Sequence, residues 1–242
     1  ARVVDQKGKE VFRYQAPEYL NYISEHVERY SYLKFPYLKK IGWKGFVDGA
    51  DSGVYQASPL SRLNVADGMA TPLAQEEYEK MYSTLGGKPV KKLLVNHWAR
   101  LIELMFAAER ILELAQDPEI ASPNFRTLPT AVPEEGVGIV EAPRGILTHH
   151  YKTDEKGLVR EANLIVGTTN NHAPISMAIK RAAQKLIQPG KEVGQGLLNM
   201  VEMAFRLYDP CFSCATHSLP GEMPFVVEVV NADGEVVHRE GR

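Results

Sequence analysis

The chain has 242 residues, of which 44% are hydrophobic and 24% are charged, and this is the composition of an ordinary globular protein with a sizeable core. Its formal net charge of -2 provides no long-range attraction for nucleic acid or for an anionic membrane surface. The sequence contains no apolar run of about 18 residues that would suggest a membrane span. Two cysteines three residues apart cannot cross-link a chain of this length, so a reducing, cytoplasmic compartment is expected.

Helical spacing of apolar residues predicts most of the N-terminal half. The first predicted helix covers Gln15 to Tyr30 and ends near Phe35 and Pro36. Turns are expected from Gly42 to Leu60. A second helix from Pro72 to Leu85 begins with Thr71 as N-cap and ends at Gly86.

The longest predicted helix, Val90 to Gln116, keeps one apolar face, as a helix of a bundle does. The positions of that face are Leu94, Leu101, Leu104, Met105, Ala108, Ile111, Leu112 and Ala115. Pairing of Arg100, Glu103 and Glu109 on a solvated or interhelical face is the default interpretation for its charged residues.

A small central sheet is expected in the second half. Extended pieces at Gly138 to Glu141, Gly145 to Tyr151 and Val159 to Val166 are separated by a break at Pro143 and Arg144 and by a turn at Asp154 to Gly157. Helices follow at Pro174 to Leu186 and Val193 to Leu207, and a C-terminal hairpin follows around Pro224 to Val237. The fold class is therefore α+β, a predominantly helical bundle with a small central sheet and a C-terminal β-hairpin.

The segment Asp209-Pro210-Cys211-Phe212-Ser213-Cys214-Ala215-Thr216-His217 holds both cysteines and a histidine three residues further on. Thiolates at this spacing can converge on one soft metal ion such as nickel, zinc, copper or iron. A structural zinc site would need a second ligand pair, which is absent from the cysteines of this sequence. A thioredoxin-like dithiol sits where a strand enters a helix, whereas this motif follows a predicted helix. A simple pair of thiols remains the third interpretation.

The complete motif resembles the C-terminal metal-binding signature of the large subunit of nickel-iron hydrogenases. Further segments resemble the cytoplasmic, cofactor-coupled branch of that family, with the bidirectional NAD-reducing type nearest and the methyl-viologen-reducing type next. These segments are Ser31 to Trp43, Pro59 to Asp67, Asn96 to Glu109, Glu141 to Tyr151 and Asn163 to Asn171.

The resemblance implies a nickel-iron centre with carbonyl and cyanide ligands on iron. In it Cys211 would be a terminal nickel ligand and Cys214 would bridge nickel and iron. Arg144, paired with Asp209, would lie over the open face of the centre, and Pro143 and Thr168 would border its cyanide ligands. His217 and the backbone carbonyl of Leu164 would bind a magnesium or iron ion nearby.

The implied function is reversible heterolytic cleavage of dihydrogen into hydride and proton. Electrons would pass to a small subunit with an iron-sulfur cluster and then, through diaphorase-type or other subunits, to NAD(P) or a similar acceptor. Residues 1–217 would be the C-terminal part of the large-subunit domain, and residues 218–242 an extension removed on maturation by an endopeptidase, with maturation chaperones as further partners.

The family's other two metal thiolates come from an Arg-x-Cys-Gly-x-Cys motif, which this sequence does not contain. We therefore expect the chain to be one piece of the catalytic subunit. The alternative is an incomplete, non-catalytic fragment or maturation client that lacks half of the cluster ligands. A relative of complex I without the thiolates is disfavoured by Cys211, Cys214 and His217. His149 and His150 are expected to be structural, since adjacent strand residues point to opposite faces.

Overall fold

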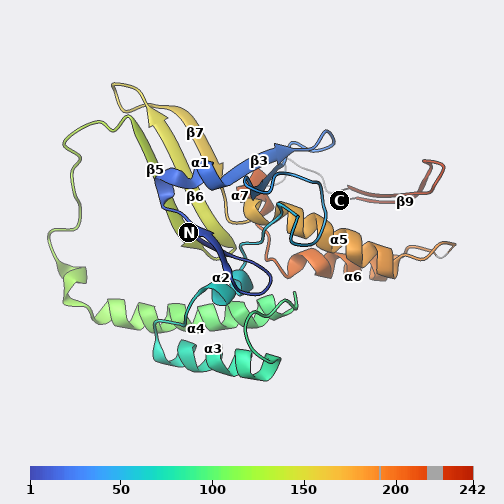
Figure 1. Cartoon of the computed structure of the whole chain (residues 1–242), viewed down its shortest axis with the longest axis horizontal. Helices are drawn as coiled ribbons and strands as arrows, with labels where there is room; N and C mark the ends of the chain where they lie inside the picture. The colour runs from blue at the N-terminus through green and yellow to red at the C-terminus, as the bar shows by residue number, and fades with distance from the viewer. Residues whose placement is uncertain (191, 217–225, 242) are drawn as a thin grey trace.

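A computed structural model describes residues 1–190, 192–216 and 226–241 of the chain. Figure 1 shows a three-stranded sheet standing above the long helix α4 (Val95–Gln116), with α3 (Pro72–Leu85) below that helix and the pair α5 (His172–Leu186) and α6 (Gln195–Arg206) beside them. Helices and small antiparallel sheets confirm the α+β class. Among the described residues, no helix is both long and apolar enough to span a membrane.

The N-terminal region is built from two hairpins rather than one helix. Strand β1 (Arg2–Val4) pairs with β2 (Glu10–Arg13), and β3 (Ile23–Val27) pairs with β4 (Lys34–Leu38), both antiparallel. Only η1 (Ala16–Glu18) and α1 (Tyr19–Tyr22) are helical. The predicted helix from Gln15 to Tyr30 is therefore wrong beyond Tyr22, because Ile23–Val27 pairs instead with the next strand along the chain, Lys34–Leu38.

The central sheet agrees with the prediction. Strands β5 (Glu135–Ala142), β6 (Gly145–Thr153) and β7 (Val159–Ile165) form an antiparallel meander in that order. Pro143 and Arg144 form the two-residue connection between β5 and β6, where Ala142 lies opposite Gly145. The predicted break is thus a tight turn that presents Arg144 at one end of the sheet.

Helix α3 begins at Pro72 and ends before Gly86, whose φ of 88° is left-handed, as predicted. Helix α4 contributes Ala99 and Ile102 to a core that also contains Leu63 of α2 (Pro59–Val65) and Met81 of α3. The apolar face predicted for α4 points away from this core and is solvent-exposed. Its residues Leu101, Leu104, Ile111 and Leu112 are 60–69% exposed. The helix is therefore confirmed, but its predicted apolar face is not the one that this core buries.

Helices α5 and α6 pack against each other, with Ile175 and Ala178 of α5 in one cluster with Ala204 of α6 and with Leu207, the residue after α6. After α6 the chain turns at Asp209 and enters the short helix α7 (Phe212–Thr216). The remaining elements are η2 (Pro118–Ala121), η3 (Thr169–Asn171), and strands β8 (Val226–Val230) and β9 (Val236–Gly241). These last strands pair as the predicted C-terminal hairpin, which extends to one side of the molecule in Figure 1.

Candidate metal centre

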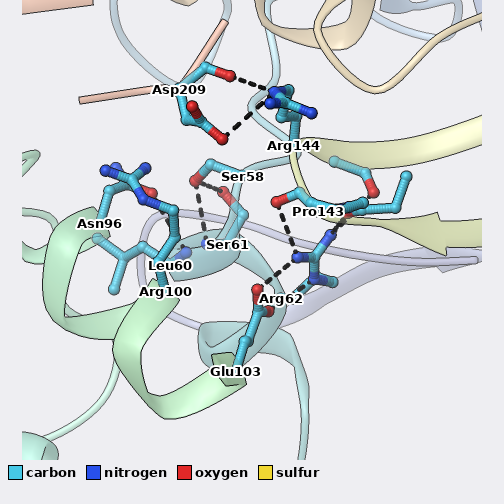
Figure 2. Close-up of polar contacts among 12 residues, drawn as sticks. Ser58, Leu60, Ser61, Arg62, Asn96, Arg100, Glu103, Pro143, Arg144 and Asp209 are labelled. Carbon is cyan, nitrogen blue, oxygen red and sulfur yellow. Dashed lines mark hydrogen bonds and ion pairs between the residues drawn. The ribbon is translucent and has the colours of Figure 1, made fainter. Parts of the chain in front are cut away.

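Arg144 and Asp209 are brought together from opposite ends of the second half of the chain. The Nε of Arg144 donates to the backbone oxygen of Asp209 at 2.5 Å and lies 3.3 Å from its Oδ2 (Figure 2). Asp209 adopts a φ of 50°, a left-handed conformation that aspartate tolerates better than most residues. Among the described residues, the two terminal nitrogens of Arg144 make no hydrogen bond, so these donors remain available to a ligand.

The backbone of Cys211 is held by Thr168. The Cys211 N–H donates to Thr168 Oγ1 at 3.0 Å, and Thr168 is only 2% exposed at the end of the segment that leads from β7 to η3. Because Oγ1 accepts this bond, the hydroxyl hydrogen of Thr168 is still free to donate elsewhere. Four predicted residues therefore form two contacting pairs, Arg144 with Asp209 and Thr168 with Cys211, and the chain joins the two pairs through Pro210.

The structure joins Cys211 and Cys214 in a disulfide, whereas the sequence analysis expects two separate thiolates. Their Cα atoms are 5.4 Å apart, because one turn at the start of α7 places both side chains on the same side. That separation suits a disulfide and also brings two sulfurs to one place, as a shared metal requires. Reduction to thiolates must precede metal binding, since only the thiolate is a metal ligand.

The other residues predicted for the metal centre are not brought into contact with the cysteines in the part of the chain that the structure describes. Leu164 is a half-buried residue of β7 opposite His149, and no contact among the described residues connects it to Cys211 or Cys214. The carbonyl of Pro143 accepts a hydrogen bond from Arg62 Nη2 at 3.2 Å. His217 lies outside the described residues.

Two buried asparagines were not recognised in the sequence. Asn171 accepts from the Ala57 N–H at 3.0 Å and donates to the carbonyl of Arg144 at 2.9 Å. Asn170 accepts from the Tyr55 hydroxyl at 2.6 Å and donates to the carbonyl of Ile146 at 2.7 Å. Both are at most 2% exposed. They connect the start of β6 to the segment before α2, and the only sequence signal was a run of polar residues, 168–171, shortly after β7.

The two adjacent histidines do not share a ligand. His149 Nδ1 contacts the hydroxyl of Tyr151 at 2.7 Å, whereas His150 Nδ1 contacts the hydroxyl of Tyr19 at 3.0 Å and its Nε2 contacts Glu135 at 2.7 Å. Each imidazole therefore has its own local partner, in agreement with the structural role expected for them.

Within residues 1–190, 192–216 and 226–241, no group of three or more His, Cys, Asp or Glu side chains could hold a metal ion. Two sulfurs held close together nevertheless suit one part of a soft-metal site. The donor set therefore fits a thiolate-bound metal centre to which other residues also contribute.

Comparison with known proteins shows the family of this chain and so bears on the interpretations left open by the cysteine motif. The family model described as "Nickel-dependent hydrogenase" matches residues 4–217. The chain belongs to this family. Its members carry a nickel-iron centre, so the zinc-site and dithiol interpretations of Cys211 and Cys214 are disfavoured.

Similar proteins include an NAD-reducing hydrogenase, the type expected first, and an F420-non-reducing one. An iron-sulfur subunit of the F420-non-reducing hydrogenase of Archaeoglobus profundus is 56% identical over 97% of this chain and 48% of its own length. The "NAD-reducing hydrogenase HoxS subunit beta" of Cupriavidus necator is 40% identical over 100% of this chain and 48% of its own length. The chain thus spans about half the length of the curated relatives it matches.

A solved structure shows the same fold. The crystal structure of an NAD+-reducing [NiFe]-hydrogenase in the H2-reduced state superposes with a TM-score of 0.79 at 35% identity, over 89% of this chain and 46% of that chain. The arrangement of helices and small sheets is therefore that of one part of a hydrogenase large subunit.

Proposed function

We propose that the chain is part of the catalytic subunit of a nickel-iron hydrogenase that cleaves dihydrogen heterolytically and reversibly. The observation that carries this proposal is the linked set of Arg144, Asp209, Thr168 and Cys211 in a member of the nickel-dependent hydrogenase family. Electrons would leave through a small iron-sulfur subunit, then through further subunits to NAD(P) or a similar acceptor, in a cytoplasmic complex.

The nickel-iron centre, when bound, supplies a Lewis acid that polarises dihydrogen. The thiolates of Cys211 and Cys214 would hold it, the first as a terminal nickel ligand and the second as a bridge to iron. The cationic guanidinium of Arg144 would use its terminal N–H donors to stabilise negative charge, including that of cyanide ligands on iron. Thr168 would donate its hydroxyl hydrogen to another cyanide, and Pro143 would border the same ligands.

His217 and the backbone carbonyl of Leu164 would bind magnesium or iron next to this centre. The match to the family model stops at residue 217, which supports a boundary between a large-subunit part, residues 1–217, and an extension, residues 218–242. We propose that maturation chaperones and an endopeptidase act on this extension. Cutting the chain after His217, in the presence of the rest of the subunit, should raise nickel retention and hydrogen uptake, and equal values with and without the extension would contradict its role.

The competing function is an incomplete, non-catalytic fragment or maturation client. The exposed apolar face of α4, with Leu101, Leu104, Ile111 and Leu112, favours operation together with the other half of the subunit, since an isolated domain rarely leaves such a face in water. Relatives about twice as long have enough additional chain to cover it.

The test is to assemble the chain with the small subunit, together with the complementary half of its own subunit, under reducing conditions. Nickel and iron in near-equal amounts, together with hydrogen uptake, support the proposal. Cys211→Ser and Cys214→Ser should abolish both metal retention and uptake, whereas Ser213→Ala, an exposed position between them, should change neither. A wild-type assembly without nickel would support the non-catalytic alternative.

A further inference from the structure

Arg62, a residue of α2, binds the turn that carries Arg144. Its Nη1 donates to the carbonyls of Ala142 and Gly145, the latter at 2.8 Å, and its Nη2 donates to the carbonyl of Pro143 at 3.2 Å (Figure 2). The fourth carbonyl of the turn, that of Arg144, accepts from Asn171. Every carbonyl of the turn is therefore bound by a side chain from elsewhere.

Glu103 of α4 fixes the guanidinium that makes these bonds. Arg62 Nε donates to Glu103 Oε1 at 2.8 Å, and Arg62 Nη2 donates to Oε2 at 2.6 Å. The two side chains are only 15% and 22% exposed. With these bonds all five N–H donors of Arg62 are used, and the bidentate pairing leaves the guanidinium one orientation.

The same helix also holds the other partner of Arg144. One turn before Glu103, Arg100 Nη1 donates to the carbonyl of Leu207 at 2.6 Å, two residues before Asp209. Helix α4 thus binds the segment of Asp209 through Arg100 and the turn of Arg144 through Glu103 and Arg62. The distance between Arg144 and Asp209 is set from a single rigid element.

We infer that Arg62, oriented by Glu103, is a positioning residue that holds the Ala142–Gly145 turn so that the guanidinium of Arg144 stays against Asp209. The inference rests on the proposed function, in which Arg144 acts beside the metal centre. A purely structural tie between α2 and α4 would need only the pair with Glu103. The three carbonyls around Arg144 that Arg62 also binds are what a positioning role requires.

The experiment uses the complete subunit in its complex, with Arg62→Met, Arg62→Lys, Glu103→Gln and the control Arg110→Met. Arg110 lies on α4, the helix of Glu103, and forms an exposed ion pair with Glu113. Displacement of a reacting group by about 1 Å costs on the order of 100-fold in rate. Arg62→Met should therefore lower kcat on the order of 100-fold with KM within about twofold of wild type. Arg62→Lys, with fewer and unforked donors, should recover part of kcat, and the control should keep it.

A second measurement separates positioning from general stability. Hydrogen exchange of the amides of residues 142–147 should be faster in Arg62→Met than in wild type and unchanged in Arg110→Met. In an Arg144→Lys background, Arg62→Met should lower kcat by less than about twofold further, because residues acting through one group are not additive. If Arg62→Met does not fold, Glu103→Gln replaces it as the test variant. This milder change should give the same lower kcat and faster exchange, with smaller effects.

Independent, multiplicative losses from Arg62→Met and Arg144→Lys would overturn the inference, as would unchanged exchange at residues 142–147. Loss of kcat in proportion to lost nickel would also overturn it. Failure of the proposed function has a different signature, namely a wild-type complex without nickel whose activity does not respond to Arg144→Lys. That result removes the catalytic part of the inference, while faster exchange in Arg62→Met alone would still support positioning of the turn.

Discussion

Replacement of Asn171 by leucine should strongly destabilise the protein, because this side chain connects three segments that meet at the candidate site. It is 1% exposed, accepts from the Ala57 N–H at 3.0 Å and donates to the Arg144 carbonyl at 2.9 Å. Longer contacts reach the carbonyls of Gly167 at 3.3 Å and Ala57 at 3.4 Å. Leucine has a similar volume but no polar atom, so the change removes the bonds without creating a large cavity.

Each buried group that loses its partner costs roughly 1–3 kcal/mol, and two good bonds are lost. Part of this cost is offset by the more favourable burial of leucine, so we expect the free energy of unfolding to fall by about 2–4 kcal/mol. For a chain of this length such a change lowers Tm by roughly 4–16 °C. Urea unfolding and thermal melting measure it, and exchange of the Ala57 amide should become faster.

The matched control is Asn199→Leu, because Asn199 is an exposed residue of α6. It should change the stability by no more than about 0.5 kcal/mol. Asn171→Asp should be no better than Asn171→Leu, since it retains the acceptor for Ala57 but turns a second oxygen towards three carbonyls. A loss below about 1 kcal/mol in Asn171→Leu, or a loss equal to that of Asn199→Leu, would refute the reasoning.

Three further changes test neighbouring contacts. Thr168→Val should cost about 1 kcal/mol and speed exchange of the Cys211 amide, whereas Thr168→Ser should do neither. Gly145→Ala should cost about 3 kcal/mol or more, because φ is 156° and a Cβ would lie 2.7 Å from the Gly167 carbonyl; Gly138→Ala, in open space, should be nearly neutral. Burial lowers the pKa of His172, so the unfolded chain binds its proton first and stability should fall as pH drops below about 6.5. His172→Gln should show a smaller fall in urea midpoint between pH 7.5 and 5.5, and an equal fall would contradict this.

Elements with local signals could be predicted, and elements that depend on distant pairing could not. Thr71, Pro72 and Gly86 mark the ends of α3, and the turn residues between extended pieces mark the central sheet. The apolar positions of Ile23–Val27 fit the spacing of a helix as well as that of a strand. Only pairing with Lys34–Leu38 makes the segment a strand. Which face of α4 is buried likewise depends on the neighbouring elements, because apolar residues occur on two sides of this helix and its sequence does not show which side will be covered.

The charged face of α4 could be predicted only in part. The default interpretation placed Arg100, Glu103 and Glu109 on a solvated or interhelical face. In the structure all three bind distant segments: Arg100 the Leu207 carbonyl, Glu103 the guanidinium of Arg62, and Glu109 the hydroxyl of Thr71. The i, i+3 pairing expected along the helix is therefore wrong, and each charge reaches another segment instead. A sequence does not show which charge reaches which distant group, since these contacts span 38 to 107 residues.

The contacts that hold the backbone of the site are buried, whereas the ion pair of the site itself is partly exposed, so dissolved salt affects the two differently. Asn171 and Thr168 are at most 2% exposed, and they position backbone groups through neutral hydrogen bonds. The ion pair of Arg62 with Glu103 is largely buried. The pair of Arg144 with Asp209 is 37% and 47% exposed, so dissolved salt screens it far more strongly. Salt should therefore loosen the guanidinium of Arg144 without moving the turn that carries it. The role proposed for Arg144, binding an anionic ligand, is compatible with this arrangement, because the backbone of Arg144 is fixed while its exposed charge is only weakly bound to Asp209.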